Sequence, residues 1–219
     1  MSRFHKAAKN DVNTVALMMA SSFAEYPFVD FFLKDAFRNE NDRARFLQKV
    51  SKILIKTLIR KGICFFEKNN GDVRAFCILS TIKDMQPTVW DMVTSGAIRL
   101  VPNMFNRAVR QFIIFYLREA ANVNFQNDPN TWYVHLFAVS PNHQGKQLGS
   151  MMMNNCVFPY VKEQHGNRIL LSTNTEMALR FYTNNGFEPI AHGEISYQGQ
   201  RFEKWDLSKD LIVEEEIKP

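Results

Sequence analysis

The stretch Trp132-Tyr-Val-His-Leu-Phe-Ala-Val-Ser-Pro-Asn-His-Gln-Gly-Lys-Gln-Leu-Gly-Ser-Met-Met-Met153 decides the fold of this chain. Aromatic and β-branched residues from 132 to 139 predict a buried strand, which Pro141 ends because proline cannot donate to a sheet ladder. Gly145 and Gly149 predict a tight turn whose backbone N–H groups no side chain covers. From Leu148 onward, apolar residues recur at helical spacing. A strand, a bare turn and a helix N-terminus in this order favour the binding of an anion, phosphate above all.

Two familiar phosphate-binding loops do not fit this turn. A Walker loop needs Gly-Lys followed by Ser or Thr, whereas Gly145 and Lys146 are followed by Gln147. A dinucleotide fingerprint needs three spaced glycines and an acidic residue about 20 residues further on, and the chain has neither here. The sequence therefore excludes these two classes of phosphate-binding loop for this turn.

Residues Gln144 to Gly149 resemble the coenzyme A loop of the GNAT superfamily of acyltransferases. That loop runs Gln or Arg, two residues, Gly, one residue, and Gly or Ala, and Gln147 stands where the inner glycine is usual. The run from Ser140 to Ser150 is most similar to the puromycin N-acetyltransferase branch. Because a right-handed helical conformation needs no glycine, we expect Gln147 to adopt one and still present its N–H. The alternative is an ordinary strand-turn-helix whose glycines serve turn geometry alone.

A second signature follows between Leu171 and Phe187. It resembles the GNAT pattern of a strand, Asn, a short helix with Ala, then Phe-Tyr, three residues and Gly-Phe. Helical spacing places Ala178 and Tyr182 on one face of that helix. Core packing of an aromatic pair is the alternative for Phe181 and Tyr182. The matching residues are Asn174, Ala178, Phe181, Tyr182, Gly186 and Phe187.

Together the two signatures imply a binding site for acetyl-CoA. The resemblance covers residues 130 to 207 well, and the N-terminal half only by the order of its elements. It implies that loop N–H groups hold the pyrophosphate, and that the pantetheine arm lies along the strand as a peptide is added to a sheet edge. The cofactor-binding residues that it implies are Phe137, Ala138, Val139, Gln144, Gly145, Lys146, Gln147, Leu148, Gly149, Ser150, Asn174, Ala178, Phe181 and Tyr182.

The chemistry of acyl transfer adds further expected roles. The thioester carbonyl needs a hydrogen-bond donor as negative charge develops on its oxygen, and the backbone N–H near Ala138 or Val139 is the candidate. By analogy with the family, Tyr182 protonates the leaving thiolate. The acceptor amine must lose a proton before it attacks, since alkyl amines have a pKa of about 10.

The sequence leaves open which base removes this proton. His135 precedes Phe137 by two residues, so we expect both side chains on the same side of the strand. A histidine satisfied by hydrogen bonds in the sheet is the alternative. Relatives of the puromycin type often carry Glu where Ser172 stands, which argues against a transferred Glu base. His143 and His192 are weaker candidates.

An aromatic patch after the first predicted helix is the candidate acceptor site. Core packing is the alternative for any single ring of this patch. A slot with few polar groups suits a flat or partly apolar amine better than a polycation. The predicted substrate residues are Tyr26, Phe28, Phe31 and Tyr133, and the slot also includes Phe32, Tyr116 and His135.

The composition is globular, with 46% hydrophobic and 22% charged residues. We expect a single domain over residues 1–219 with a helical insertion at about 84–130. No apolar run reaches the roughly 20 residues that span a bilayer, and no signal-peptide core is present, so we predict no membrane partner. The net charge of +5 is spread along the helices, which disfavours nucleic acid. Cys64, Cys77 and Cys156 lack metal-ligand spacing and predict reduced core residues in a cytoplasmic protein without a bound metal.

The order of predicted elements indicates an α/β (α+β) fold of the GNAT type. It is a mixed, mostly antiparallel central sheet of about seven strands flanked by helices, with the helical insertion before the central strand. The expected strands lie at 3–7, 63–68, 73–82, 132–139, 168–173, 187–196 and 201–207, and the expected helices at about 10–25, 39–60, 105–123, 148–164 and 175–184.

We predict an acetyl-CoA-dependent N-acetyltransferase that acts on the primary amine of a small molecule, as a monomer or homodimer. Two alternatives stay open. One is a non-catalytic acyl-CoA-binding or sensing domain, which Gln147 and the unplaced base favour. The other is a protein N-acetyltransferase acting on lysine or N-terminal amines. The insertion favours a small molecule, because it can roof the acceptor site.

Overall fold

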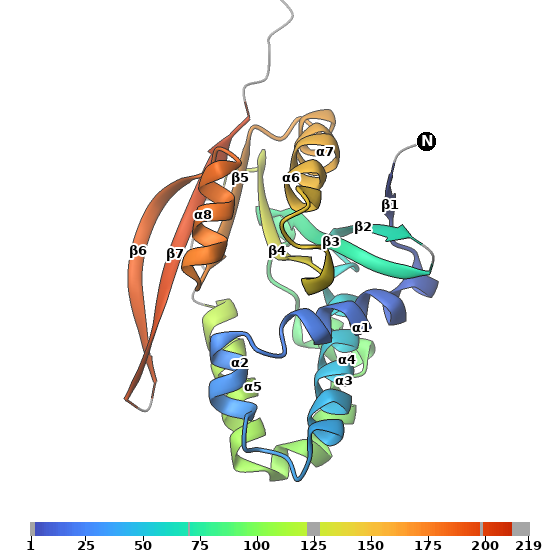
Figure 1. Cartoon of the computed structure of the whole chain (residues 1–219), viewed down its shortest axis with the longest axis vertical. Coiled ribbons are helices and arrows are strands. Elements are labelled where there is room, and N and C mark those ends of the chain that lie inside the picture. The colour runs from blue at the N-terminus through green and yellow to red at the C-terminus, as the bar shows by residue number, and fades with distance from the viewer. Residues whose placement is uncertain (1–2, 70, 122–127, 198, 212–219) are drawn as a thin grey trace, which may run out of the picture.

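The computed structural model describes residues 3–69, 71–121, 128–197 and 199–211 and shows one sheet of seven strands in the order β1-β2-β3-β4-β5-β7-β6 (Figure 1). Every neighbouring pair is antiparallel except β4 and β5, which are parallel. The predicted mixed, mostly antiparallel sheet is confirmed. Its strands are β1 (Phe4–Lys6), β2 (Ile63–Asn69), β3 (Asp72–Thr81), β4 (Thr131–Val139), β5 (Arg168–Thr173), β6 (Glu188–Tyr197) and β7 (Gln200–Asp210).

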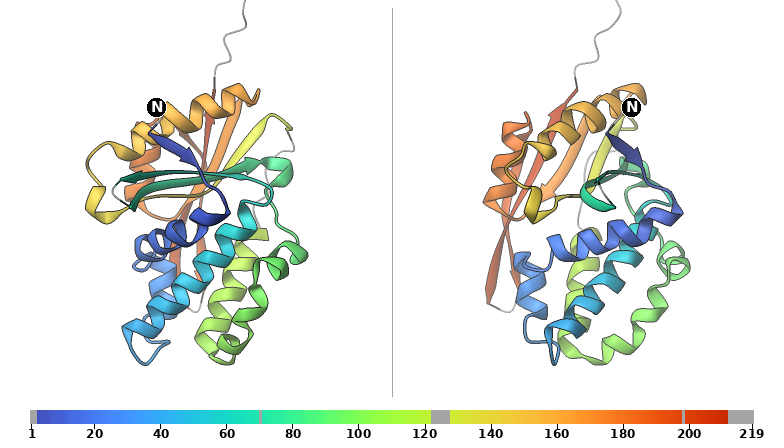
Figure 2. Two further views of the ribbon diagram at one scale, coloured as in Figure 1. Left: turned by 90° about the vertical axis from the view of Figure 1, so that its right-hand side faces the viewer. Right: turned by 45° about the vertical axis from the view of Figure 1, so that its right-hand side comes forward.

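Helices cover both faces of this sheet (Figure 2). The α-helices are α1 (Val12–Ser22), α2 (Pro27–Leu33), α3 (Glu40–Leu58), α4 (Val89–Ser95), α5 (Arg107–Ala121), α6 (Leu148–Met152), α7 (Phe158–Glu163) and α8 (Glu176–Asn184). The shorter helices are η1 (Lys9–Asp11), η2 (Ile82–Asp84), η3 (Ala97–Phe105), η4 (Pro141–His143) and the π-helical turn η5 (Met153–Val157), which joins α6 to α7.

Two buried clusters hold the helices to the sheet. On one face, Leu148, Met152 and Val161 pack with strand residues such as Cys77 and Val134. On the other face, α1 and α3 pack against β2, β3 and β4 through a second buried cluster. The central strands are therefore covered on both sides, which explains their nearly continuous apolar sequence.

Local capping signals explain where several helices begin. Asn39 Oδ1 accepts from the Asp42 N–H at 2.9 Å and caps the start of α3. Thr175 Oγ1 accepts from the Ala178 N–H at 3.3 Å and starts α8 in the same way. α1 ends at Ser22, before Pro27, and Pro27 occupies the first position of α2, where proline loses no hydrogen bond. The sequence predicted the break and not the short helix that follows it.

The insertion contains more structure than the single helix that was predicted there. Residues 122–127, where that helix was expected to end, lie outside the described residues. Before α5, the chain forms α4, which Thr88 caps, and then turns at Gly96 with φ of 105° into η3. The inner face of α5 packs Phe112 and Phe115 against α2, in a third cluster that also includes part of the β6–β7 hairpin.

The parallel pairing of β4 and β5 is short, and this opens the sheet. It runs from Thr131 opposite Arg168 only to Val134 opposite Leu171. Beyond Val134, residues 136–139 of β4 pair with β3 but not with β5, so the edge of β4 that faces β5 is open there. Backbone N–H and C=O groups on that edge are therefore available to an added strand or to a ligand that imitates one.

A β-bulge at the opening changes which side chains share a face. On β3, Ile78 pairs with Leu136 and Leu79 with Val134, so His135 is the extra residue on β4. Because a bulge breaks the alternation of side chains, His135 lies beside the ring of Tyr133, whereas Phe137 packs with α6 and α8. The prediction that His135 and Phe137 share one side of the strand is wrong for this reason.

Candidate active site

The predicted coenzyme A loop follows β4 directly and is held by backbone bonds. The Ser140 N–H donates to the Arg74 carbonyl at 2.8 Å, and the His143 N–H donates to the Ser140 carbonyl at 2.8 Å. Gly145 then takes a φ of 73°, which glycine adopts without steric cost. The Gln144 side chain folds back so that its Nε2 donates to the Val139 carbonyl at 3.1 Å. The loop therefore has a defined path between the open strand edge and α6.

The first turn of α6 presents backbone donors to this loop. The first backbone bond of the helix runs from the Met151 N–H to the Gln147 carbonyl at 2.9 Å. The N–H groups of Leu148, Gly149 and Ser150 come before that bond, so they precede the ladder of the helix. These donors and the helix dipole suit a phosphate group. The arrangement fits the pyrophosphate of coenzyme A.

Gln147 does not adopt the conformation that its helical prediction required. It has φ of 57° and ψ of 7°, the left-handed conformation, and serves as the N-cap residue of α6. This is the region in which a side chain crowds the backbone and in which glycine is preferred. Gln147 stands where the family loop usually has its inner glycine, and the backbone of this chain has a positive φ at that position.

Gln147→Gly is therefore expected to raise the free energy of unfolding by about 1 kcal/mol, because it removes the cost of a left-handed residue with a Cβ. Part of the gain is lost to the larger chain entropy of glycine. Thermal unfolding should show Tm higher by about 2–4 °C. Coenzyme A affinity should change by less than about threefold, since the backbone already presents its N–H groups and one tenfold step in affinity needs about 1.4 kcal/mol.

His165→Gly is the matched control for this prediction. His165 also has φ of 57° and is exposed, but it lies in the turn after α7. It should gain similar stability with no change in coenzyme A affinity, measured by calorimetry. A large gain in affinity that is confined to Gln147→Gly would show that the native loop binds coenzyme A poorly, and would favour the sensing alternative.

Gly149 lies where the helix meets an aromatic pair. The Phe137 and Phe181 rings stack at 5.2 Å between centroids with an interplanar angle of 13°. A Cβ on Gly149 would lie 2.9 Å from Cε2 of Phe181 and 3.3 Å from Cζ of Phe137. Glycine is thus required for close approach of α6 to these rings. The rings form an apolar wall beside the loop, at the open edge of β4.

Tyr182 lies one residue beyond this wall, in the buried core. Its ring is 6.2 Å from that of Phe137 and 5.5 Å from that of Phe187. Burial raises the pKa of Tyr182 well above its ordinary value, and the phenols of Tyr26 and Tyr133 add to the rise. The Tyr182 hydroxyl therefore keeps its proton at neutral pH. Three phenols from α2, β4 and α8 converge on the open end of the parallel pair.

His135 lies beside the Tyr133 ring, on the face of β4 opposite Phe137. Its Nε2 lies 2.9 Å from Ser80 Oγ, which lies 3.0 Å from the Thr81 carbonyl. A carbonyl can only accept, so when Ser80 donates to Thr81 the His135 Nε2–H must donate to Ser80, which leaves Nδ1 with a lone pair. Burial lowers the pKa of His135 to about 4, so the ring is neutral at neutral pH.

The other two candidate histidines, His143 and His192, lie in different surroundings. His192 is exposed on β6, where its ring stacks on Trp205 at 5.1 Å and its Nε2 lies 2.6 Å from the Glu203 carboxylate. His143 is half-buried in η4, within the loop. The structure brings neither to the phenols of Tyr133 and Tyr182.

Tyr133 leads to a carboxylate that the sequence did not indicate. Its hydroxyl donates to Ser172 Oγ at 3.3 Å, and Ser172 donates to Asp206 Oδ1 at 2.5 Å. Burial raises the pKa of Tyr133 to about 12. Ser172 and Asp206 face each other across β5 and β7. Strand register is the signal that would have found Asp206, and it requires the sheet order to be known.

The aromatic patch of α2 divides between the core and the candidate acceptor side. Phe28 and Phe32 pack on Phe112 and Phe115 of α5, as the core alternative predicts. Phe31 is half-buried and meets Phe202 of β7 at 5.5 Å.

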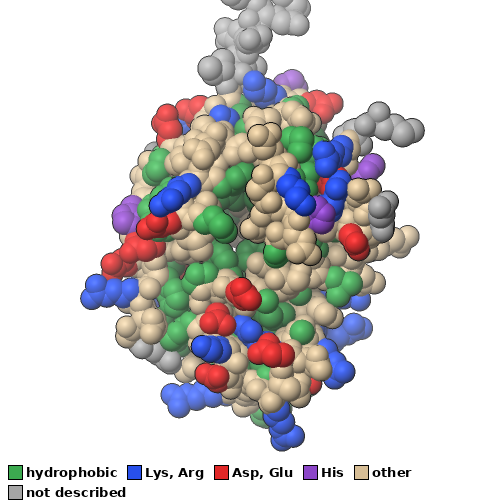
Figure 3. Space-filling model, viewed as in Figure 1, with side chains coloured by type: hydrophobic (Ala, Val, Ile, Leu, Met, Phe, Trp, Pro, Cys, Tyr) green, Lys and Arg blue, Asp and Glu red, His purple; other side chains and the backbone are tan. Residues whose placement is uncertain are grey.

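Tyr26 and Tyr116 are slot residues outside the sheet that approach its strands. The Tyr26 hydroxyl lies 3.4 Å from Asn174 Oδ1 and accepts from the Asn174 N–H at 3.2 Å, which ties α2 to the end of β5. Asn174 also donates from Nδ2 to the Glu203 carbonyl at 2.8 Å. Tyr116 of α5 is close enough to Tyr133 for the two phenols to interact, and burial raises its pKa to about 12. In Figure 3, hydrophobic side chains gather down the middle of the face seen in Figure 1.

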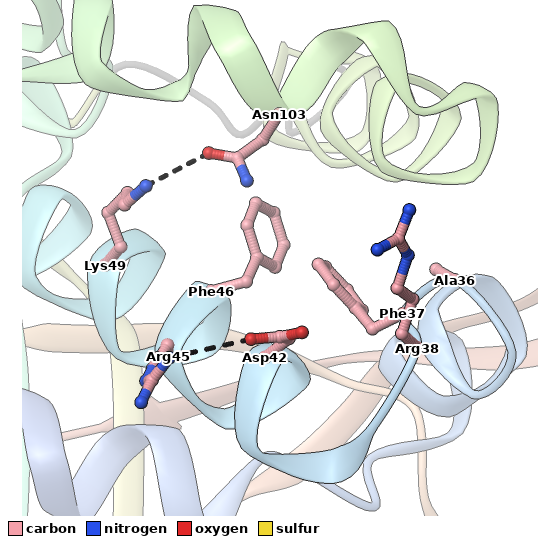
Figure 4. A pocket seen from close by; sticks show the side chains of 8 residues that line it. All are labelled: Ala36, Phe37, Arg38, Asp42, Arg45, Phe46, Lys49 and Asn103. Atoms are coloured by element: carbon pink, nitrogen blue, oxygen red, sulfur yellow. Dashed lines mark hydrogen bonds and ion pairs between the residues drawn. The ribbon is translucent and has the colours of Figure 1, made fainter.

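A hollow lies away from this site, between α3 and η3 (Figure 4). It has a volume of about 450 Å³, and Lys49 Nζ donates to Asn103 Oδ1 across it at 3.1 Å. It shares no residue with the coenzyme A loop or with the phenols. Its lining residues are Ala36, Phe37, Arg38, Asp42, Arg45, Phe46, Lys49 and Asn103.

Comparison with known proteins finds a family match over the part of the chain that contains the loop. Residues 109–189 match the family model described as an acetyltransferase (GNAT) domain. That span runs from α5 through β4, the loop, α6 to α8 and into β6, so it includes both signatures. The match supports an acetyltransferase that uses acetyl-CoA as its acetyl donor.

Solved structures share the fold along the whole chain at low sequence identity. The histone acetyltransferase HPA2 and related acetyltransferase from Corynebacterium glutamicum superposes with a TM-score of 0.60 at 17% identity, over 98% of this chain and 99% of that one. The ribosomal-protein-S18-alanine N-acetyltransferase from Escherichia coli gives a TM-score of 0.56 at 11% identity, over 100% and 99%. A probable acetyltransferase from Staphylococcus epidermidis gives 0.56 at 13% identity, over 97% and 100%. None of the helices in the described part of the chain has the length and apolar character needed to cross a bilayer.

Proposed function

We propose that this protein transfers the acetyl group of acetyl-CoA to the primary amine of a small molecule, by direct attack within a ternary complex. The observation that carries the proposal is the arrangement around the short β4–β5 pairing. The helix N-terminus of α6, the open edge of β4 and the buried phenol of Tyr182 lie on one side of it, and Tyr133 and His135 lie on the other. The first side suits acetyl-CoA, the acetyl donor, and the second suits the acceptor amine. The resemblance of the loop to the puromycin N-acetyltransferase branch is part of this proposal.

Different residues of the donor side are proposed to bind different parts of acetyl-CoA. The N–H groups of Leu148, Gly149 and Ser150 are proposed to hold the pyrophosphate, with Gln144, Gly145, Lys146 and Gln147 forming the rest of the loop. The open edge of β4 at Phe137 and Val139 is proposed to align the pantetheine arm, and Ala178 and Phe181 of α8 to wall it. Acetyl-CoA supplies an activated acyl carbonyl. The N–H of Ala138 or Val139 is the proposed donor to its oxygen.

Tyr182 is the proposed acid for the leaving thiolate. Its pKa is raised by burial, so it carries a proton at neutral pH, and it can donate that proton as negative charge develops on the leaving sulfur. Asn174 keeps the end of β5 next to Tyr26, so the phenols stay together at the opening.

On the acceptor side, the helical layer favours a small molecule over a peptide. α2 and α5 pack together through Phe28 and Phe112 and face the sheet. Tyr26, Phe31, Tyr116 and Tyr133 are the proposed walls. Asp30, which could have attracted a polycation, is already paired with Arg43 at 3.0 Å. An amine with an aromatic or apolar body fits this lining best.

Arylalkyl amines are therefore expected to be acetylated with kcat/KM at least roughly tenfold above that for spermidine or an aminoglycoside, since burial of a few methylene groups is worth this much. The panel should also include a peptide with a free N-terminal alanine and one with an internal lysine. Initial rates of thiol release with acetyl-CoA measure all five. A clear preference for spermidine or an aminoglycoside would contradict the apolar slot, and a preference for either peptide would favour a protein N-acetyltransferase.

A further inference from the structure

A continuous chain of hydrogen bonds leaves the acceptor side of the site through the sheet. It begins at the Tyr133 hydroxyl on β4, passes through Ser172 Oγ on β5, and ends at the Asp206 carboxylate on β7. Ser172 and Asp206 are register partners, and Tyr133 lies opposite Leu170, two positions before Ser172, so the chain crosses three neighbouring strands. Such an arrangement is specified by the sheet and not by a flexible loop.

The chemistry of the end group fixes the direction of this chain. An ionised carboxylate has no hydrogen to donate, so Ser172 must donate to Asp206. Ser172 has one hydrogen, and its oxygen is therefore left to accept from the Tyr133 hydroxyl. The Tyr133 proton then points toward Ser172, and its oxygen presents electron density away from Ser172.

The two ends of the chain lie in different surroundings. Tyr133 is buried and lies 5.2 Å, ring to ring, from His135, and its phenol is near those of Tyr116 and Tyr182. The Asp206 side chain keeps 22% exposure, and the nearest cation is Lys204, whose Nζ is 3.8 Å from Oδ1. The chain thus joins the interior of the proposed acceptor site to a group in contact with solvent.

We propose that Asp206, acting through Ser172 and Tyr133, is the route by which the acceptor ammonium loses its first proton to solvent. This inference rests on the proposed function. The ammonium N–H bond breaks and its proton binds Tyr133 Oη. The Tyr133 proton moves to Ser172, the Ser172 proton moves to Asp206, and Asp206 passes it to water. Tyr133 and Ser172 end the cycle as neutral hydroxyls, and Asp206 ends it as a carboxylate.

The protons of the whole reaction balance with this route. An ammonium group brings three hydrogens to the site. One leaves through Asp206 before attack, one ends on the coenzyme A thiol by way of Tyr182, and one remains on the product amide. The transfer therefore releases one proton to solvent for each amide formed from an ammonium. His135 is neutral and its Nε2 is bound to Ser80, so it lies outside this route.

Two acceptors that differ in charge separate a proton route from a merely structural role. An arylalkyl amine arrives as an ammonium at pH 7, whereas an arylamine arrives neutral and has no first proton to lose. Asp206→Asn is expected to lower kcat/KM for the arylalkyl amine by about 10²-fold, the lower range for a positioned proton-transfer group. It should change kcat/KM for the arylamine by less than about threefold, because a neutral amine has no first proton to pass along this route.

The matched control is Asp210→Asn, four positions along β7, where the carboxylate pairs with Arg168 at 2.6 Å. It should leave the ratio of the two acceptors unchanged. Since Ser172 and Asp206 are register partners, the pair Asp206→Ser with Ser172→Asp moves the carboxylate one strand toward Tyr133. This double variant should recover at least about a tenth of the lost rate with the arylalkyl amine, whereas Asp206→Ser alone should not.

The outcomes distinguish this inference from the proposed function. Equal loss with both acceptors in Asp206→Asn, with Tm unchanged, would overturn the proton route while leaving acetyl transfer intact. An unchanged rate with both acceptors would overturn it as well. If the wild-type protein acetylates neither acceptor although it binds coenzyme A, the proposed function itself is wrong and the route falls with it.

Discussion

Tyr182→Phe is expected to lower kcat by about 10²–10⁴-fold, the range for a positioned general acid, while coenzyme A affinity stays within about threefold. The substitution removes one oxygen from a buried ring whose neighbours Phe137 and Phe187 contact its apolar body, so the packing should persist. Steady-state kinetics with an arylalkyl amine gives kcat, and calorimetry gives the affinity.

Tyr160→Phe is the matched control for this loss. Tyr160 is a half-buried tyrosine on α7 that packs against Phe65 and Trp132, and burial raises its pKa too. Its variant should keep the wild-type kcat. A Tyr182→Phe enzyme that works at the full rate would reduce Tyr182 to a packing residue, and the thiolate would then take its proton from elsewhere.

Gly149→Asp is expected to weaken coenzyme A binding by at least about 100-fold. Like charges placed together in an interface cost several kcal/mol, and every 1.4 kcal/mol is tenfold in affinity. The new carboxylate would face the pyrophosphate at the first turn of α6. Its Cβ would also lie 2.9 Å from the Phe181 ring, which must then move from its stack on Phe137.

Two further variants separate charge from shape in this loss. Gly149→Ala adds the Cβ without the charge and tests the displacement of Phe181 alone. Gly193→Asp places the same carboxylate on the exposed strand β6, where a Cβ meets nothing within 4 Å, and should leave binding unchanged. Wild-type affinity of Gly149→Asp for coenzyme A, measured by calorimetry, would show that the N-terminus of α6 does not bind the pyrophosphate.

Short-range patterns were enough to predict the elements that build the donor side. The strand at 132–139, the helix that begins at Thr175 and the glycine turn at Gly145 follow from local rules, and β4, α8 and the αL conformation of Gly145 confirm them. Gly149, which was expected to bracket the turn, lies within α6. Backbone conformation at Gln147 was predicted wrongly, because propensity permits Gln in a helix and only the loop closure imposes positive φ.

Features that depend on register could not be read from the sequence. The bulge that turns His135 away from Phe137 arises from pairing with β3, and no residue type announces it. Asp206 becomes a neighbour of Ser172 only because β7 inserts between β5 and β6 in the sheet. The sequence predicted that Phe28 and Phe32 lie in one aromatic patch. It could not show that both pack on α5 in the core, because that depends on tertiary contacts.

Acceptor-dependent acetyl transfer is the central claim, and one measurement tests it directly. The protein is mixed with acetyl-CoA with and without an arylalkyl amine, and the free thiol and the N-acetylated amine are quantified by thiol titration and mass spectrometry. We expect thiol release that depends on the amine, with one acetylated amine formed for each thiol. Saturable binding of acetyl-CoA by calorimetry together with no amine-dependent thiol release, across the acceptor panel, would contradict it and leave a domain that senses acyl-CoA.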